Sequence, residues 1–261
     1  MTGVQTCALP ILTENPYAFL SEEYLLKTCS TDLSGLWRLS DILVQLQELA
    51  GKQCQLLGCG RLDLLREHGL VWVLTRTEIR VRRMPSLGEK VKITTWAAPP
   101  RRMIFPLYFT VTDRDGATVL DSATQWVLCG LEDRRMKNAP EIGAMIPTPD
   151  REPAFTRFSS PPLIETGKRV FFAEPRYSDL DVNGHVNNTR YADWLCDALG
   201  IDTMKQKRIA VFTVDCRHEV LPGDRLEMVL GTDSGGFSLS GKKDDVLYFD
   251  IGGTFAPDAA Q

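Results

Sequence analysis

The sequence predicts an α+β fold in which an antiparallel β-sheet wraps around one long central helix, with this unit present twice in tandem. One observation is the order of segments, in which a stretch with helical spacing of apolar residues precedes several short runs rich in β-branched residues. This order occurs on both sides of a proline-rich stretch, residues 137–168. The turns at 86–89 and 221–224 also match in place and character, which indicates an internal duplication. Two unrelated α+β domains are the alternative.

The first unit is predicted to occupy residues 12–136 and to begin with a strand at 24–30 and a turn at 31–35. We expect Ser40 to cap the helix that follows, with Asp41 favouring its positive start. Apolar residues recur along this helix every three or four positions and predict one buried stripe: Leu43, Leu46, Ala50, Cys54 and Leu57. Runs rich in β-branched residues, separated by turn-forming residues, then predict strands at 71–83, 90–96, 105–112 and 118–128.

The second unit is predicted to occupy residues 169–258 and to repeat this order. A strand is expected at 169–176, followed by a helix that starts near Asn188. One face of that helix is apolar, with Tyr191, Trp194, Leu195, Ala198 and Leu199. Four further strands are predicted at 209–220, 225–230, 237–242 and 246–255.

Two segments are expected to lie outside the repeated units. Residues 137–168 contain six prolines, so we expect a linker through which neither a helix nor a central strand runs. Residues 1–11, MTGVQTCALPI, lack the basic and long apolar regions of a signal peptide and resemble translated sequencing-adapter sequence. We expect them to be a non-native or disordered N-terminus.

Composition narrows the classes of function. The 261 residues are 43% hydrophobic and 25% charged, with a net charge of −4, which argues against a general nucleic-acid binder. No apolar run approaches the roughly 20 residues that span a bilayer, so no membrane association is expected. The seven cysteines form no CxxC pair and have no histidine at metal-ligand spacing, so we expect free thiols in a reducing cytoplasm, and neither a metal nor a cofactor.

Polar residues concentrate in the stretch 177–188, where Asp181, Asn183 and His185 alternate directly before a predicted helix. In an extended segment, alternation would send these three side chains to one side. The helix start would add free backbone N–H groups and a partial positive charge, suited to a thioester carbonyl that develops negative charge. A capped turn without catalytic function is the alternative, because Asp and Asn also satisfy local backbone groups.

The string SDLDVNGHVNNTRYADW resembles the signature of acyl-acyl carrier protein (acyl-ACP) thioesterases, a plant and bacterial family with a double hotdog fold. The segment GLVWVLTRTEIRVRRMPSLGEKVKITTW in the first half is also similar to that family. The resemblance implies hydrolysis of acyl-ACP to free fatty acid and holo-ACP, which terminates fatty acid synthesis. The implied partner is ACP with a phosphopantetheine-linked acyl chain. An acyl-CoA thioesterase and a non-catalytic acyl-binding hotdog protein are the alternatives.

The resemblance also implies the catalytic residues, which are Asp181, Asn183, His185 and Glu219. Val220 stands where the plant enzymes often have cysteine, which excludes a Cys–His nucleophile there, and nearby Cys216 is expected to be core. Either Glu219 and His185 activate a water, or Asp181 attacks to form an anhydride.

The first unit is expected to be catalytically degenerate and to receive the acyl chain. Matching Thr31-Asp32-Leu33 to Ser178-Asp179-Leu180 places Ser34, Leu36 and Arg38 opposite Asp181, Asn183 and His185, and the glycine turns place Met84 opposite Glu219. Basic clusters at 82–83, 101–102 and 134–137 could dock an acidic carrier protein, although solvated strand ends are the commoner explanation of such clusters. A homodimer is permitted but not required, since the duplication already pairs two units.

Overall fold

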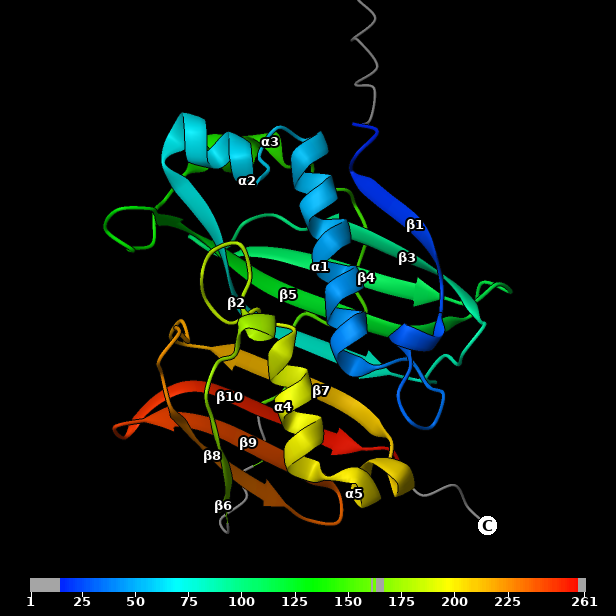
Figure 1. The fold of residues 1–261 in the computed structure, drawn as a ribbon. Coiled ribbons are helices and arrows are strands. Elements are labelled where there is room, and N and C mark those ends of the chain that lie inside the picture. Colours follow the sequence, from blue (N-terminus) through cyan, green and yellow to red (C-terminus); the bar gives the residue numbers. More distant parts are fainter. Residues whose placement is uncertain (1–14, 161, 163–166, 258–261) are drawn as a thin grey trace, which may run out of the picture.

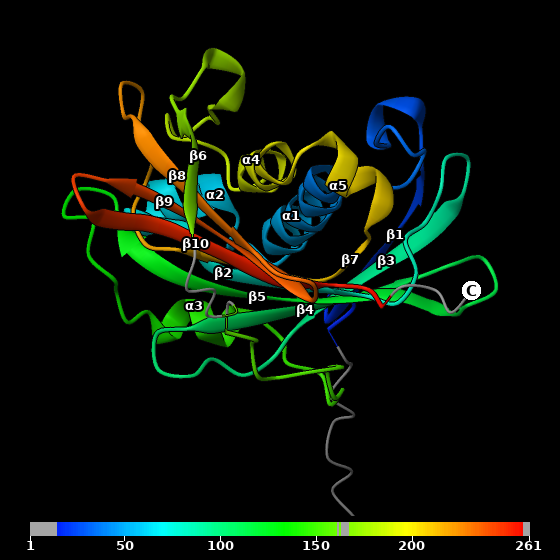
Figure 2. The same cartoon turned by 90° about the horizontal axis from the view of Figure 1, so that it is seen from below.

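In the part of the chain that the structure describes, ten strands form one continuous antiparallel sheet, and the two main helices pack side by side on one face of it (Figures 1 and 2). The computed structural model describes residues 15–160, 162 and 167–257, so the expectation for residues 1–11 lies outside the described part. The strand order is β1-β3-β4-β5-β2-β7-β10-β9-β8-β6. The strands are β1 Phe19–Leu25, β2 Leu70–Val81, β3 Lys90–Ala97, β4 Phe105–Thr112, β5 Thr118–Gly130, β6 Lys168–Ala173, β7 Ile209–Cys216, β8 Leu226–Thr232, β9 Gly236–Lys243 and β10 Val246–Phe255.

The two halves of the sheet have the same topology. From the outer edge inward the first half runs β1-β3-β4-β5-β2, and the second runs β6-β8-β9-β10-β7, with each strand at the corresponding place in its half. The halves join where β2 pairs with β7, and at this seam Arg76 Nε lies 2.6 Å from Asp215 Oδ1. The predicted fold class, a tandem double hotdog, is confirmed. The domain boundaries drawn from the sequence remain a prediction that this topology supports.

The central helix of the first half, α1 (Leu39–Leu56), buries Leu43, Leu46 and Ala50 of the predicted apolar stripe, whereas Cys54 is only partly buried and Leu57 follows the helix. The predicted cap is wrong: the helix starts at Leu39, the N-cap position is Arg38, and Ser40 lies in the first turn. Asp41 explains this start, because its carboxylate accepts hydrogen bonds from Trp37 Nε1 at 2.7 Å and Tyr24 Oη at 3.0 Å. These bonds fix how the chain enters the helix without a serine cap.

The second half has the same arrangement. Its central helix α4 (Arg190–Leu199) is followed by α5 (Ile201–Gln206), and Tyr191, Trp194, Leu195 and Leu199 are buried as predicted. Both helices contribute to one apolar core that runs across the seam of the sheet. The second half is therefore packed onto the first and is not merely tethered to it.

Strand interiors were predicted better than strand ends. The segment predicted as a first strand at 24–30 is instead the end of β1 and a 3₁₀ turn, η1 (Thr28–Ser30). In the same way β6 ends at Ala173 and is followed by η3 (Tyr177–Asp179). Strand β7 ends at Cys216, before the predicted 220, because the N–H groups of Arg217 and His218 both donate to the Tyr248 carbonyl and end the regular ladder.

The proline-rich segment contains a short helix, α3 (Pro140–Met145), which the sequence analysis excluded. Proline is tolerated here because it occupies the first helical turn, where its missing N–H would have no partner. Residues 146–160, here called the strap, then cross the face of the sheet opposite α1 and α4 (Figure 2). The strap is anchored on β2, where Arg76 and Arg80 stack on Phe158 and Phe155 and buried Glu78 accepts hydrogen bonds from Ser159.

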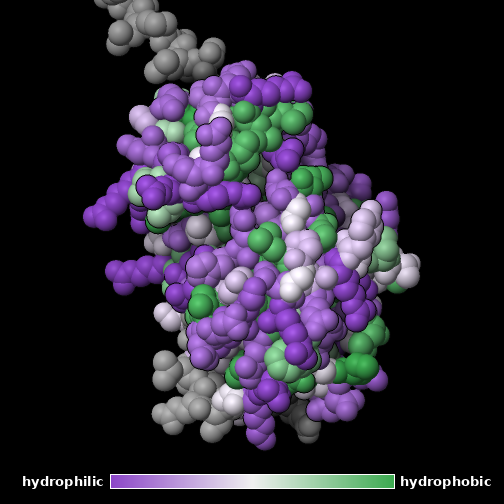
Figure 3. Space-filling view, turned by 60° about the vertical axis from the view of Figure 1, so that its left-hand side comes forward, coloured by the Kyte–Doolittle hydropathy of each residue, from purple (hydrophilic) through white to green (hydrophobic). Residues whose placement is uncertain are grey.

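On the molecular face seen in Figure 3, hydrophobic residues lie scattered among hydrophilic ones and do not merge into one large apolar surface. Helices that are both long enough and apolar enough to cross a membrane do not occur in the described residues.

Candidate active site

The candidate catalytic loop is a closed turn just before α4 (Figure 1). Leu180 and Val186 pair at its base, and the Asp181 N–H donates to the His185 carbonyl at 2.9 Å. Gly184 takes a left-handed conformation, with φ of +79°, where a side chain would be strained. The expectation of an extended, alternating segment is therefore wrong. The turn, and not strand alternation, brings the three polar side chains together.

Within this turn Asp181 organises the other two residues. Its Oδ1 accepts the Asn183 backbone N–H at 2.8 Å, and its Oδ2 accepts the Asn183 side-chain amide at 3.3 Å. His185 Nδ1 lies 3.7 Å from Asp181 Oδ2 and 3.2 Å from the Val186 carbonyl. Because a carbonyl can only accept, this contact assigns Nδ1 as the donor, and in the neutral tautomer Nε2 is then the nitrogen that can accept a proton.

Glu219 reaches the same place from the segment after β7. The Val186 N–H donates to the Val220 carbonyl at 2.9 Å, and both valines are buried, which ties the residue after His185 to the residue after Glu219. Asp181, Asn183, His185 and Glu219 all line one cavity of about 1200 Å³. The imidazole and the distant carboxylate therefore open onto a shared space.

Much of the wall of this cavity comes from the first half. Apolar side chains of strands β2, β4 and β5 line it, including Trp72, Leu74, Phe105, Leu107 and Trp126, whereas α1 presents mostly polar side chains such as Gln47, Lys52 and Gln53. The volume exceeds the roughly 300–1,000 Å³ of ordinary small-molecule pockets. A long apolar group attached to a polar reacting centre fits such a cavity.

Two arginines of the first half contact the candidate catalytic side chains. Arg134 Nη1 donates to Glu219 Oε1 at 2.8 Å, and Arg61 Nε donates to Asn183 Oδ1 at 3.2 Å. The sequence analysis placed Arg134 only in a basic cluster and did not single out Arg61. No sequence signal could have found these contacts, because the partners are 85 and 122 positions apart.

Cys216 and Tyr191 lie in the cavity wall in their neutral forms. Burial, and to a lesser degree the charge of Asp215, raises the pKa of the Cys216 thiol to about 12. The thiol donates to Asn188 Oδ1 over 3.8 Å and packs against the main core, as predicted. Burial also raises the pKa of Tyr191, whose ring stacks on Phe249 with 4.4 Å between centroids. Neither group is poised as a nucleophile.

The first half has an equivalent turn in a different register from the one expected. Asp32 N–H donates to the Leu36 carbonyl at 2.8 Å, as Asp181 does to His185. Asp32, Ser34 and Leu36 are thus the counterparts of Asp181, Asn183 and His185, so the predicted pairing of Ser34, Leu36 and Arg38 with these residues is wrong by two positions. The similarity of Thr31-Asp32-Leu33 to Ser178-Asp179-Leu180 is therefore not a structural correspondence, because Asp32 takes the place of Asp181 and not of Asp179.

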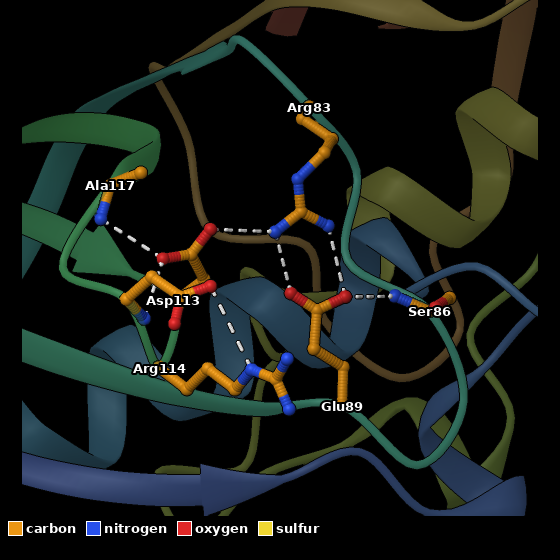
Figure 4. Close-up of polar contacts among 7 residues, drawn as sticks. Arg83, Ser86, Glu89, Asp113, Arg114 and Ala117 are labelled. Atoms are coloured by element: carbon orange, nitrogen blue, oxygen red, sulfur yellow. Dashed lines mark hydrogen bonds and ion pairs between the residues drawn. The ribbon is translucent and has the colours of Figure 1, made fainter.

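The counterpart of Glu219 is Met84, as predicted, because the turns that follow are held in the same way. The Ser86 N–H donates to Glu89, and the Leu221 N–H donates to Asp224. Next to Met84, Arg83 pairs with Glu89 and Asp113 in a surface ion-pair network (Figure 4). The first-half turn therefore keeps an aspartate but lacks the amide, the imidazole and the second carboxylate.

To bind a metal ion, the part of the chain that the structure describes would need several ligand side chains placed together. Groups of three or more His, Cys, Asp or Glu side chains placed to hold an ion do not occur there.

Fold and site together define a class, namely tandem hotdog proteins with a polar cluster at the wall of a large, partly apolar cavity. Residues 18–145 match the acyl-ACP thioesterase N-terminal domain, and residues 167–248 match the acyl-ACP thioesterase C-terminal domain. Since these matches cover more than half of the sequence, the chain belongs to the acyl-ACP thioesterase family.

Individual relatives agree with this membership. An acyl-carrier-protein hydrolase of Cuphea viscosissima, named chloroplastic, is 27% identical over 209 residues, which cover 74% of this chain and 49% of that protein. A chloroplastic dodecanoyl-acyl-carrier-protein hydrolase of Cinnamomum camphora is 29% identical over 197 residues, with coverage of 70% and 50%. The chain spans about half the length of these curated relatives.

Solved structures share the fold. An acyl-ACP thioesterase from Bacteroides thetaiotaomicron gives a TM-score of 0.83 at 24% identity, covering 92% of this chain and 98% of that one. The 12:0-ACP thioesterase from Umbellularia californica gives a TM-score of 0.77 at 19% identity, with the same coverage. At these identities the likeness concerns the fold alone.

Proposed function

We propose that this chain hydrolyses long acyl thioesters of acyl carrier protein, releasing free fatty acid and holo-ACP and thereby terminating fatty acid synthesis. The observation that carries the proposal is the position of Asp181, Asn183, His185 and Glu219 on the wall of a cavity of about 1200 Å³, to which the first-half strands β2, β4 and β5 contribute an apolar wall. The two family matches support the same reaction.

In the proposed mechanism, Glu219 and His185 Nε2 hold a water and remove its proton as the water attacks the thioester carbonyl. Asn183 orients this water, and Asp181 holds the turn. The Asn188 N–H, at the cavity wall just before α4, is suited to stabilise the developing oxyanion. Collapse of the tetrahedral intermediate breaks the C–S bond, and the proton passes to the thiolate of the carrier. Direct attack by Asp181, giving an anhydride that water then opens, is the alternative.

Replacing His185 or Glu219 by alanine tests the assignment. General-base assistance typically contributes about 10²–10⁴ in rate, so each variant should lose at least about a hundredfold in kcat/KM for acyl-ACP. Release of the carrier thiol measures the reaction. His68→Ala is the matched control, because this exposed histidine at the end of η2 (Leu64–His68) does not line the cavity. Unchanged hydrolysis in both site variants would rule the assignment out.

Carrier identity belongs to the same proposal. Acyl-ACP and acyl-CoA present the same phosphopantetheine thioester, so competition at equal concentration separates them. We expect acyl-ACP to be consumed first, and preferential loss of acyl-CoA would favour the alternative. Tight acyl binding without turnover would instead favour an acyl-binding protein.

A cytoplasmic location is a further part of this proposal, and a homodimer is compatible with it but not required. The described cysteines are free thiols, which supports a reducing compartment. Cell fractionation tests the location, and light scattering of the purified protein tests the dimer.

A further inference from the structure

The turn that follows β5 is fixed in an unusual backbone conformation. Arg134 has a φ of 54°, in the left-handed region that residues with side chains rarely occupy. The Arg134 N–H donates to the Gly130 carbonyl, and the Gly130 N–H donates to the Arg135 carbonyl. Asp133 accepts the Arg135 N–H and pairs with Lys137. The surroundings thus hold Arg134 in a conformation that glycine would adopt more easily.

This conformation directs the Arg134 side chain across the seam to Glu219. The guanidinium and carboxylate meet at 2.8 Å, with side-chain exposures of 59% and 37%. A pair this exposed is screened by water and contributes little to folding stability. Stability therefore does not explain a strained arginine at this position. Strained backbone of this kind is found preferentially at functional sites.

Arg61, from α2 (Arg61–Asp63), acts on the neighbouring catalytic side chain. Its Nε donates to Asn183 Oδ1, so the amide group must point its nitrogen the other way, toward Asp181 Oδ2. This contact fixes which end of the Asn183 amide faces Asp181. Both contacts join a residue of the first half to the reacting groups of the second.

We propose that Arg134 and Arg61 are positioning residues that the catalytically degenerate first half supplies to the active site of the second half, an inference that rests on the proposed thioester hydrolysis. Arg134 holds the Glu219 carboxylate in one orientation beside the cavity, and Arg61 holds the Asn183 amide. The first half thus contributes to the geometry of the reacting groups as well as to the acyl-binding wall.

Steady-state kinetics with acyl-ACP tests this inference. Since a displacement of about 1 Å can cost about a hundredfold in rate, Arg134→Gln and Arg61→Gln should each lower kcat about 10- to 100-fold with KM changed less than about twofold. Arg134→Lys should recover part of the loss, because an ammonium can still hold the carboxylate. Arg134→Gly should lower kcat like Arg134→Gln while the unfolding temperature is unchanged or higher, since glycine relieves the strain.

Matched controls are two exposed arginines elsewhere in the first half. Arg114→Gln, at the opposite end of β5, and Arg66→Gln, in η2, should leave kcat unchanged. An active wild-type enzyme with unchanged kcat in both Arg134→Gln and Arg61→Gln overturns the inference and leaves the proposed function standing. A rise in KM alone also overturns it, because it assigns the arginines to carrier docking. A wild-type chain that does not hydrolyse acyl-ACP overturns both.

Discussion

At the residue scale, the burial of Cys216 argues against a cysteine nucleophile and for hydrolysis by an activated water. With a thiol pKa of about 12, only about one molecule in 10⁴ carries the thiolate at pH 8. We therefore predict that iodoacetamide at pH 8 modifies the exposed Cys29 and leaves Cys216 unmodified in the native protein. Peptide mass spectrometry measures both sites. Alkylation of Cys216 as fast as that of Cys29, with loss of hydrolysis, would return a thiolate mechanism to consideration.

The sequence alone predicts those candidate site residues that lie close together along the chain. Asp181, Asn183 and His185 lie within five positions, and one turn of the chain is enough to bring them together. Glu219 was found only through the family resemblance, because a lone glutamate near a strand end carries no signal of its own. Arg61 and Arg134 depend on tertiary packing between the halves, and neither spacing nor composition indicates such contacts.

At the element scale, the pairing of β7 with β10 places two carboxylates, which repel each other when ionised, on neighbouring strands. Asp250 lies opposite Asp215 in the register, and both side chains are partly buried. Burial mainly, and then the Asp215 charge, raises the pKa of Asp250 above its ordinary 3.8. A carboxyl with a raised pKa in the folded state stabilises the fold below pH 3.8. That contribution is lost as pH rises through the folded-state pKa.

Asp250→Asn should therefore stabilise the protein at neutral pH. Because the amide cannot ionise, we expect the unfolding temperature at pH 7 to rise by about 1–4 °C, with the gain vanishing below pH 4. Thermal unfolding followed by circular dichroism at both pH values measures this. Asp115→Asn, in an exposed turn, is the control and should change nothing. Equal unfolding temperatures of the Asp250 variant and the wild type at pH 7 would refute the repulsion between these carboxylates.

Element interiors follow from periodicity, whereas their ends depend on contacts between distant segments. The first three residues of the predicted α1 stripe (Leu43, Leu46 and Ala50) and the spans of β4 and β10 match their predictions because helical spacing and alternation set them. The end of β7 depends on the Tyr248 carbonyl, a group that is distant in sequence. The six prolines of residues 137–168 predict no helix, yet α3 forms because Pro140 lies in its first turn, where a missing N–H costs no hydrogen bond.

At the scale of the whole molecule, the two similar halves form one continuous sheet that carries one candidate site. The seam strands β2 and β7 are central in the sheet, the main core includes residues of both α1 and α4, and the cavity takes its walls from both halves. The sequence predicts two units but cannot show that they share a sheet, because the seam pairing joins residues more than 100 positions apart.

Glu78 tests whether the halves unfold together. This fully buried carboxylate lies on β2 opposite Thr213 of β7. It accepts hydrogen bonds from Arg80 of its own strand and from Ser159 of the strap. Removing a buried charged acceptor typically costs about 2–4 kcal/mol, so Glu78→Ala should lower the unfolding temperature by about 5–12 °C. Because β2 and β7 pair along the seam, we expect a single calorimetric transition in both the wild type and the Glu78 variant, with matching calorimetric and van't Hoff enthalpies.

Glu152→Ala, which changes an exposed residue of the same strap, is the control and should leave the unfolding temperature unchanged. Glu78→Gln provides a milder variant if the alanine protein does not fold. Two resolved transitions, with only one moved by the Glu78 substitution, would mean that the halves are separate folding units joined only by their linker.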